Sequence, residues 1–451
     1  MITLNRHSRE SGNPANQIIP AKQDNKNILS DSRNIFSCWI PAFAGMTCSG
    51  FAIKIVPFAL LAIATTASAT ESDWRTSWDG TLYGYANSTS LRNDSILNPS
   101  NQIARLAQGS DVAELRLNFK AENDTVRFTA RPIASVRQMR NGFGTQQRDE
   151  SYLSQWQVRV RAAESWNVAA GREVLNWGAG QFRSPSSPFY FDSGRSDPMR
   201  ELVGMDTLKV SWTPNLKSSV NVARIVRSGY GVTQPDEWRN SWLAKFDQRG
   251  DQWSAGLVTV KAPHLPTFYG VYAQKTVSDA VMVYGEFGSS AQSSALQSPE
   301  DIAQPFTVQT PSSRHNTVLI GSTYTFENGN ALIAEYLHDG NGYSADEECA
   351  YFQRATTQPA MALGLAPRLL GRDYLNIVWQ SNQLESSGFW RMMLTHSLTD
   401  GGKALTGYYE KNLTTRISAF ALGVWNSGNA RQEFSSLMSR NATVGLKVAL
   451  L

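Results

Sequence analysis

The chain has 451 residues, of which 41% are hydrophobic and 18% charged, with a formal net charge of +4. A mean hydropathy of −0.33 argues against a bundle of membrane-spanning helices, and the mild charge gives no ground for nucleic acid as a partner. Cys38, Cys48 and Cys349 fit no zinc spacing, so we expect neither a metal nor any other cofactor.

The first feature in chain order is a secretory signal peptide at residues 46–69. Lys54 is followed by an apolar run from Ile55 to Ala64 and by the small residues Ala67-Ser-Ala69. A short positive flank, a short apolar run and a small-x-small cleavage site define such a signal. The run is too short to cross a bilayer as a helix, which needs roughly 20 residues. We therefore expect export, with the mature chain starting at Thr70.

About fifty residues precede this signal, which is an unusual position for it. Two pieces of this region, Arg6–Pro14 and Trp39–Thr47, resemble the translation product of a short interspersed DNA repeat found in some bacterial genomes. We therefore interpret residues 1–45 as a misannotated upstream leader, with translation starting at Met46 or nearby.

After Thr70, short segments of alternating polarity follow one another and turn residues separate them. In the segment from Val112 to Lys120, for example, Leu115 and Leu117 alternate with Glu114 and Arg116. Alternation with a period of two is typical of strands that bury or shield one face. We expect strands of this kind at 112–120, 125–137, 156–162, 281–287, 317–326, 374–380, 403–410, 415–425 and 442–450.

The whole mature chain contains about 18 such strands, most of them near the roughly ten residues that a tilted membrane strand needs. Connections after even-numbered strands are short. Those after odd-numbered strands are expected to be long at 87–109, 138–150, 177–204, 228–238, 289–313, 341–370 and 427–439. Two connections, 263–266 and 399–403, break the rule because they are short.

Short turns on one side and long loops on the other predict an all-β fold, a single transmembrane antiparallel up-and-down β-barrel over 70–451. A strand edge cannot stay open in lipid, so the sheet must close. The expected location is the outer membrane, with its lipids and the barrel-assembly machinery as partners. A soluble periplasmic sandwich or propeller is the alternative, but it does not explain the loop asymmetry.

Aromatic residues support the membrane interpretation, because many stand near the ends of proposed strands, as interfacial girdles require. They are Trp74, Trp78, Tyr152, Trp212, Trp238, Trp242, Trp253, Tyr269, Tyr272, Tyr324, Tyr336, Trp379, Trp390, Tyr408 and Trp425. The carboxyl terminus departs from the usual pattern of an aromatic last residue. Its apolar set is Val444, Leu446, Val448 and Leu450, one residue out of phase with Leu451.

No enzymatic motif is present, so the chain is not expected to be an enzyme and no catalytic residue is assigned. The sequence His338-Asp339 near the outer rim, followed by Asp346, Glu347 and Glu348, permits a catalytic dyad or a cation site. The favoured interpretation is an acidic solvated loop.

Arginines recur on the polar faces of the first strands, in the phase opposite to the apolar residues. In a barrel they would line the lumen, where a basic wall attracts anionic solutes. Alternatively, these charges only pair with carboxylates across strands. The predicted pore-lining wall consists of Arg116, Arg127, Arg131, Arg137, Arg159 and Arg161.

The third long loop, 177–204, is the most distinctive segment. It follows a strand that ends Gly171-Arg-Glu-Val-Leu-Asn-Trp-Gly178 and precedes a strand Met205–Trp212. A G-R-x-x-x-x-W-G strand end with a proline- and aromatic-rich loop resembles outer-membrane barrels of the porin and alginate-export type. That resemblance implies a loop folded inward as a constriction, formed by Arg183, Tyr190, Asp192, Arg195, Asp197, Arg200 and Glu201.

The expected function is that of a porin-like channel for passive passage of hydrophilic, anionic small solutes or polysaccharide, without covalent chemistry. One alternative is a non-transporting outer-membrane barrel that binds or helps to assemble exopolysaccharide. A second, weaker alternative is an outer-membrane hydrolase.

Overall fold

The computed structural model describes residues 74–190, 195, 199–230, 236–291, 296–297, 307–308, 314–367, 369–382 and 387–450. The predicted leader (1–45) and signal peptide (46–69) lie outside the described residues.

The chain forms one 18-stranded antiparallel sheet. Its strands are β1 (Arg75–Leu91), β2 (Gly109–Glu122), β3 (Val126–Asn141), β4 (Gly144–Ala163), β5 (Trp166–Glu173), β6 (Met205–Asn215), β7 (Ser218–Arg227), β8 (Ser241–Arg249), β9 (Trp253–Lys261), β10 (Phe268–Thr276), β11 (Val281–Ala291), β14 (Arg314–Thr325), β15 (Ala331–Asp339), β16 (Asp373–Gln380), β17 (Gly388–Ser397), β18 (Lys403–Asn412), β19 (Ile417–Ser427) and β20 (Met438–Leu450). Outside the sheet lie a short 3-10 helix η3 (Pro99–Asn101), the two-stranded pair β12 (Leu296–Gln297) and β13 (Thr307–Val308), and helices α2 (Ala345–Ala355) and α3 (Pro359–Gly364).

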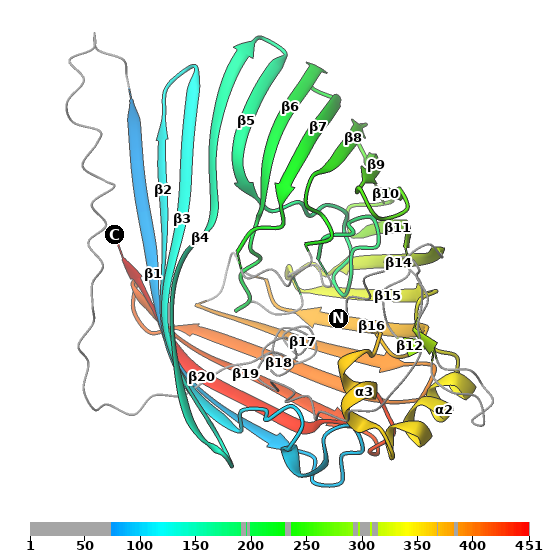
Figure 1. Cartoon of the computed structure of the whole chain (residues 1–451). Coiled ribbons are helices and arrows are strands. Elements are labelled where there is room, and N and C mark those ends of the chain that lie inside the picture. The colour runs from blue at the N-terminus through cyan, green and yellow to red at the C-terminus, as the bar shows by residue number, and fades with distance from the viewer. Residues whose placement is uncertain are drawn as a thin grey trace, which may run out of the picture.

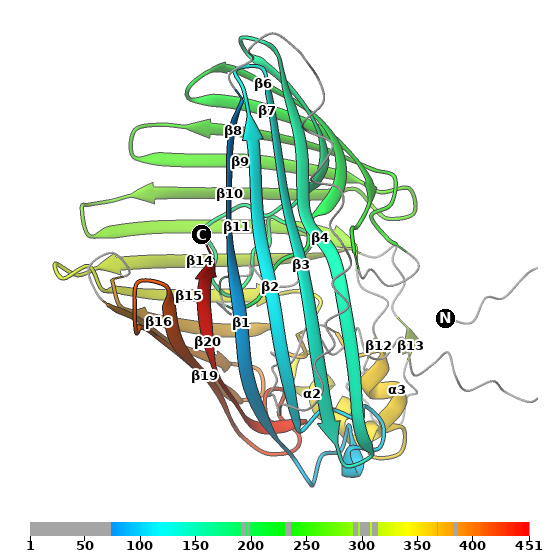
Figure 2. The same ribbon diagram turned by 90° about the vertical axis from the view of Figure 1, so that its left-hand side faces the viewer.

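The sheet closes on itself, which confirms the predicted up-and-down barrel. Each strand pairs with the next in the chain, and β1 also pairs with β20, with Leu82 opposite Val448. The first and last strands run side by side in both ribbon views (Figure 1 and Figure 2). Every strand of the described sheet therefore pairs with a neighbour on both sides, as a lipid environment demands.

The connections follow the predicted asymmetry with one exception. Short turns join the even-numbered strands to their successors, as at 123–125, 164–165 and 216–217, whereas long loops occupy 174–204, 292–313 and 340–372. The prediction of a long loop at 138–150 is wrong. There β3 continues to Asn141 and β4 begins at Gly144, so the two strands form a tight hairpin. The polar composition of this segment belongs to long strands rather than to a loop.

The outer surface of the sheet is apolar. Residues that alternate outward are exposed although they are hydrophobic, and they include Leu82, Val168, Leu208, Val222, Leu257, Val271, Ile320, Leu394, Val444 and Leu446. Exposed aromatic rings accompany them, among them Trp78, Trp212, Trp242, Trp253, Tyr269, Tyr324, Trp379 and Trp425. A closed sheet with this surface fits a bilayer and not water.

Four aromatic residues from the predicted girdle lie elsewhere. Tyr152 stands opposite the buried Ile133 in the inward phase of the β3–β4 hairpin, and Trp238 packs against the ring of Phe189. Tyr272 and Tyr408 are buried on the inner side of the sheet, where the Tyr272 hydroxyl donates a hydrogen bond to Asp247 and that of Tyr408 donates one to Glu410. Their position near a strand end did not reveal which face they occupy. In the part of the chain that the structure describes, no helix is long and apolar enough to cross a membrane.

Three outer loops pack into a compact body, here called the outer cap, formed by residues 92–108, 340–372 and 428–437. Leu97, Tyr351, Phe352, Leu363 and Leu437 share its apolar core. Helix α2 starts with a capping box, in which the Ser344 side chain accepts a hydrogen bond from the backbone of Glu347 and the Glu347 side chain accepts one from the backbone of Ser344. Figure 1 shows α2 and α3 together beside the strands β14 to β16.

Candidate functional site: the barrel lumen

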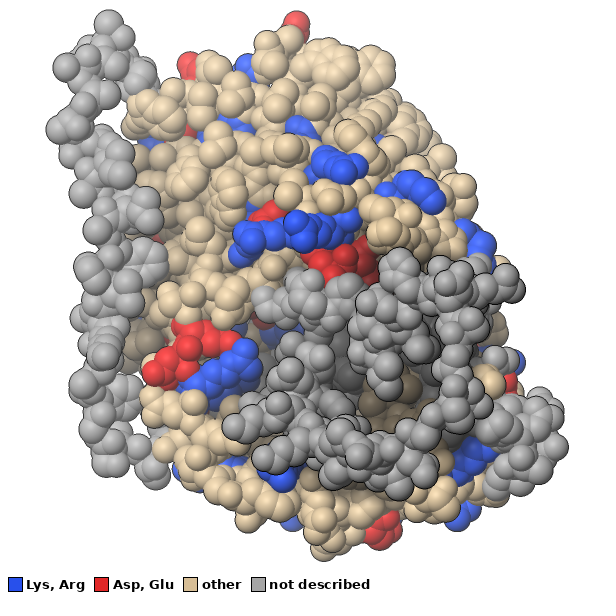
Figure 3. All heavy atoms as spheres, viewed as in Figure 1, with Lys and Arg blue, Asp and Glu red and all other residues tan. Residues whose placement is uncertain are grey.

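The lumen is lined by the residues that alternate with the exposed apolar set. On β15, for example, Tyr336 points outward and is exposed, whereas its neighbour Glu335 points inward and is 2% exposed. This alternation follows from the strand period of two. The same phase places charged side chains inside the barrel. Figure 3 shows acidic and basic side chains close together on the face of the molecule that is turned toward the viewer.

All six predicted wall arginines lie in the inward phase of β2, β3 and β4. On β2, Leu115 and Leu117 pair with the outward residues Leu82 and Gly80 of β1, so Arg116 between them points inward. Across the hairpin, Arg127 stands directly opposite Arg159. The complete basic set on this inner wall is Arg116, Lys120, Arg127, Arg131, Arg137, Arg148, Arg159 and Arg161, and the acidic set is Glu114, Glu122 and Glu150.

Half of the predicted arginines are neutralised by carboxylates. Arg116 lies 2.5 Å from Glu114. Arg131 lies 2.7 Å from Glu201 of the loop between β5 and β6, and Arg127 lies 2.8 Å from Glu122. Of these three pairs, Arg127–Glu122 is the cross-strand neutralisation expected as the alternative, whereas Arg116 pairs with a carboxylate of its own strand and Arg131 with one of the loop.

The other three predicted wall arginines are not neutralised in this way. Among the described residues, Arg137, Arg159 and Arg161 make no ion pair and no side-chain hydrogen bond. Arg159 faces Arg127, and Arg137 faces Arg148, so the register sets like charges directly opposite one another. Such pairs are unfavourable by themselves, and an anion between them would relieve the repulsion.

The loop between β5 and β6, residues 174–204, is called the inner loop because its described residues lie inside the ring of strands (Figure 1). Its first part is bound to Glu286 of β11, a carboxylate that is only 3% exposed. Glu286 accepts hydrogen bonds from the Gly180 amide at 2.8 Å and from the Ser184 and Ser186 hydroxyls, both at 2.7 Å. A buried carboxylate is costly unless such donors surround it, so wall and loop stabilise each other.

A second buried carboxylate, Glu335 of β15, holds the next residues of the same loop. It accepts hydrogen bonds from the backbone amides of Gln181 at 2.6 Å and Phe182 at 2.9 Å. The Tyr284 hydroxyl and the Asn376 amide complete its environment, at 2.7 and 3.0 Å. Neither Glu286 nor Glu335 was singled out in the sequence, although each is a charged residue inside an otherwise apolar strand.

The end of the inner loop is bound to the opposite wall. Glu201 contacts Arg131 and lies 3.6 Å from Arg116, whose guanidinium also donates to the Met199 carbonyl at 2.7 Å. The Met199 side chain is buried against the cluster that contains Tyr85 and Phe420. The loop therefore crosses the lumen from β11 and β15 to β2 and β3.

The other predicted constriction residues are distributed along this loop. Arg183 forms an ion pair with Asp339 of β15, and Tyr190 donates a hydrogen bond to the Val203 carbonyl at 3.0 Å. Arg195 donates to the carbonyls of Gly180 and Gly178, at 2.9 and 3.0 Å. Arg200 lies in the described part of the loop between Met199 and Glu201, whereas Asp192 and Asp197 lie outside the described residues.

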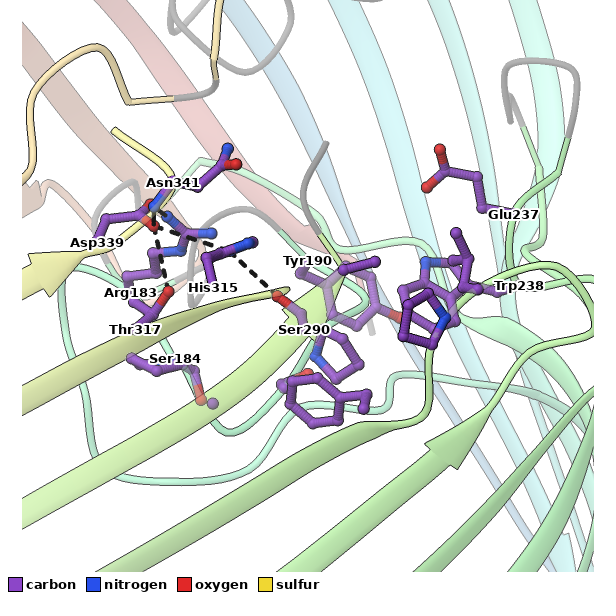
Figure 4. Close-up of a pocket in the computed structure, with 18 residues that line it drawn as sticks. Arg183, Ser184, Tyr190, Glu237, Trp238, Ser290, His315, Thr317, Asp339 and Asn341 are labelled. Atoms are coloured by element: carbon purple, nitrogen blue, oxygen red, sulfur yellow. Dashed lines mark hydrogen bonds and ion pairs between the residues drawn. The ribbon is translucent and has the colours of Figure 1, made fainter. Parts of the chain in front are cut away.

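A pocket of about 180 Å³ lies beside the inner loop at the outer ends of β10 to β15 (Figure 4). Tyr190, Trp238 and Phe268 provide its apolar side. Its polar side is built around Asp339, which accepts hydrogen bonds from Thr317 at 3.2 Å and from the Asn341 amide at 3.1 Å. The pocket therefore combines aromatic rings with the carboxylate of Asp339, which the guanidinium of Arg183 neutralises.

This pocket contains Ser290, His315 and Asp339, but they do not form a catalytic triad. The same ring nitrogen of His315, Nε2, lies 3.1 Å from the Ser290 hydroxyl and 3.9 Å from Asp339. A triad needs the serine and the aspartate on opposite ring nitrogens. Asp339 is also neutralised by Arg183, so the arrangement does not activate the serine.

The proposed pairing of His338 with Asp339 does not form. The two residues are consecutive on β15 and point to opposite faces, with His338 outside and 2.8 Å from Asp373. The acidic residues that follow are not a solvated loop either, since they start helix α2 and Glu348 is buried. The described residues contain no group of three side chains suited to hold a metal ion.

No protein-family model and no curated protein sequence matches the chain. Among solved structures it is similar to OccK11 (OpdR) of Pseudomonas aeruginosa, with 10% identity and a TM-score of 0.48 over 83% of this chain and 96% of that one. It is also similar to OprD of the same organism (9%, 0.47, 85% and 98%) and to a triple mutant of the Rhodopseudomonas blastica porin (12%, 0.43, 83% and 100%). With values this low, the description of the fold rests on the strand pairing of the chain itself.

The closed sheet of 18 strands, its apolar outer surface and its charged lumen define an outer-membrane β-barrel with porin-like architecture.

Proposed function

We propose that the barrel is a passive channel for hydrophilic solutes that prefers anions, either small molecules or a charged polysaccharide. The observation that carries the proposal is the inner loop, whose described residues contact two walls of the lumen, while one wall keeps arginines that have no carboxylate partner among the described residues. A loop inside a water-filled barrel narrows the path, and excess positive charge raises the local concentration of anions.

The division of charge along the wall supports a path with two anion-rich regions. Arg159 and Arg161 lie near the short turn 164–165, and Arg137 lies near the opposite end of the β3–β4 hairpin. Between them, Arg116 and Arg131 are occupied by Glu114 and Glu201. An anion would therefore meet free guanidinium groups before and after the inner loop, and no bond in the solute needs to break.

Ion selectivity in planar bilayers tests this proposal. The double variant Arg159→Gln/Arg161→Gln is expected to lower the anion-to-cation permeability ratio, measured as reversal potential in a KCl gradient. The matched control, Lys411→Gln/Arg416→Gln, removes the same charge from exposed positions of the β18–β19 hairpin and is expected to leave the ratio unchanged. Unaltered selectivity in the first variant would reject the role of the basic wall.

A second candidate function is a non-transporting barrel that binds or helps to assemble exopolysaccharide. The observation that favours it is the amount of structure inside and above the lumen, namely the inner loop and the outer cap. Tyr374 of β16 connects the two, because its ring packs against Phe182 of the inner loop and against Phe434 of the outer cap. A purified barrel that inserts into bilayers and gives no conductance, with the inner loop intact or shortened, would favour this function over a channel.

A further inference from the structure

Three carboxylates from three different outer segments meet inside the outer cap. Glu348 belongs to helix α2, Asp400 to the connection 398–402, and Glu433 to the loop 428–437. Glu348 and Glu433 are each 2% exposed. Like charges at close range in a buried place repel strongly, so such a cluster needs either cations or protons.

The hydrogen bonds around Glu348 leave its carboxyl group without a donor. Neither of its oxygens has a hydrogen-bond partner among the described residues when the group is charged. The polar groups that face it are the Asp400 carboxyl, within hydrogen-bonding reach, and the Glu433 carboxyl, together with the hydroxyls of Tyr343, Tyr351 and Tyr374. The nearby Arg372 is bound to Glu347 at 2.8 Å and to the Gly342 carbonyl.

The same cluster connects the outer segments to each other. Asp400 accepts a hydrogen bond from the backbone amide of Glu433 at 2.6 Å, and Glu433 accepts one from that of Leu370 at 3.2 Å. The Tyr374 hydroxyl donates to Glu433, and the Tyr374 ring packs against Phe182 of the inner loop with 5.8 Å between ring centroids. A change at the carboxylates is therefore transmitted to the inner loop.

We propose that Glu348, Asp400 and Glu433 form a proton-sharing latch that holds the outer cap closed over the inner loop and loosens as its carboxyl groups lose their protons. A proton between Glu348 and Asp400 supplies the donor that the cluster lacks and removes one of the repelling charges. The effect on solute passage rests on the proposed channel function, whereas the latch itself does not.

The direction of the pH response follows from the two buried groups. Burial, with Asp400 as the next cause, raises the pKa of Glu348 to about 10, and burial raises the pKa of Glu433 to about 8. In an opened cap both would return to their ordinary value of 4.5. Above that value the closed cap binds protons that the open cap releases, so closure weakens as pH rises.

The two groups act over different ranges. Between about pH 5 and 8 both contribute, and each changes the open-to-closed ratio by up to roughly tenfold per pH unit. Above about pH 8 only the loss of the Glu348 proton still weakens closure. Above about pH 10 the open-to-closed ratio no longer changes with pH. The cap is therefore expected to be most firmly closed at mildly acidic pH.

A spin label on Cys349 tests the latch without any reference to transport. Cys349 is exposed on helix α2, next to Glu348, and is the single cysteine in residues 70–451. A neutral nitroxide attached there reports the mobility of α2 by electron paramagnetic resonance while the barrel is titrated in detergent from pH 5 to 10. We expect mobility to rise with pH in the unmodified barrel, more steeply below pH 8 than above it.

Two variants isolate the groups. Glu348→Gln keeps the shape and adds an amide donor toward Asp400, so the rise above pH 8 is expected to disappear. Glu433→Gln should instead make the rise of label mobility below pH 8 less steep and leave the rise above pH 8 unchanged. The control Asp346→Asn changes an exposed carboxylate in the same helical turn and should behave like the unmodified barrel.

A label whose mobility does not change with pH, or an equal rise in Glu348→Gln and in the unmodified barrel, would overturn the latch. Open probability in planar bilayers, with pH varied on the loop side, then tests the link to passage. A pH-dependent label together with a barrel that never conducts would leave the latch standing and remove the channel function. A conducting barrel whose open probability does not change with pH while the mobility of the label does would show that the latch does not control passage.

Discussion

The carboxylate of Glu335 on β15 accepts a hydrogen bond from the backbone amide of Phe182 at 2.9 Å, although 153 residues separate the two. With the bonds from the Gln181 amide and the Tyr284 hydroxyl, it fixes the inner loop to the far wall of the barrel. The position of the loop therefore depends on charged residues in distant strands.

Removing this acceptor should release the loop. In Glu335→Ala the amides of Gln181 and Phe182 lose their partner, which costs about 1–3 kcal/mol for each buried donor. We expect a higher and noisier single-channel conductance, measured in planar bilayers. Glu327→Ala, in the exposed turn 326–330, is the control and should conduct like the unmodified barrel. Unchanged conductance in Glu335→Ala would show that the loop does not narrow the path.

Gly178 should be intolerant of any side chain. Its φ of +84° lies in the left-handed region, and an added Cβ would overlap the carboxylate of Glu286. Gly178→Ala is expected to displace the start of the inner loop and raise conductance, with a strain cost of about 1–2 kcal/mol from the backbone alone. Gly142→Ala meets no atom within 4 Å and serves as the control. Equal conductance and melting temperature for the two variants would contradict this role.

Glu201 tempers the positive charge of the near wall, so its removal should increase anion preference. Glu201→Gln leaves the guanidinium of Arg131, now 2.7 Å from a carboxylate oxygen, without a charged partner. A unit charge about 10 Å away in water contributes about 0.4 kcal/mol, so the permeability ratio should shift roughly twofold toward anions. Reversal potentials measure this, with Asp279→Asn in the exposed turn 277–280 as the control. A shift toward cations would refute the electrostatic argument.

The mature chain should start at Thr70. Mass spectrometry of the barrel purified from outer membranes of the native organism is expected to find Thr70 at the amino terminus and no peptide from residues 1–45. Peptides from residues 1–40 in the precursor would refute the interpretation of the leader.

The alternation of polar and apolar residues was enough to predict the barrel, because each strand must face lipid on one side and water on the other. Val444, Leu446, Val448 and Leu450, for example, were assigned to a last strand, and they form the outward face of β20. The boundary between strand and loop is harder to predict, because both faces of a strand are polar where it extends beyond the lipid. The polar segment 138–150 therefore predicts a loop, although it continues β3 and β4.

The lumen was less accessible to sequence reasoning. The phase of the arginines placed them inside, but their partners come from distant segments, as Glu201 does for Arg131. Glu286 and Glu335 each stand out as a charged residue in an apolar strand, but their function depends on donors in a loop more than a hundred residues earlier. Helix α2 did have a local signal, the Ser344-x-x-Glu347 capping box, which was overlooked inside an acidic stretch.

The pairing of β1 with β20 imposes an order on biogenesis. The ring cannot be sealed until the last residues of the chain have arrived, and the inner loop must by then already lie within it. Arg116 and Arg131, on strands made before the loop, hold its end, whereas Glu286 and Glu335, which hold its first part, belong to strands made long after it. A chain truncated before β11 would keep the contacts of the loop with β2 and β3 but lack those with Glu286 and Glu335, so the first part of the loop is fixed in the lumen only in the second half of synthesis.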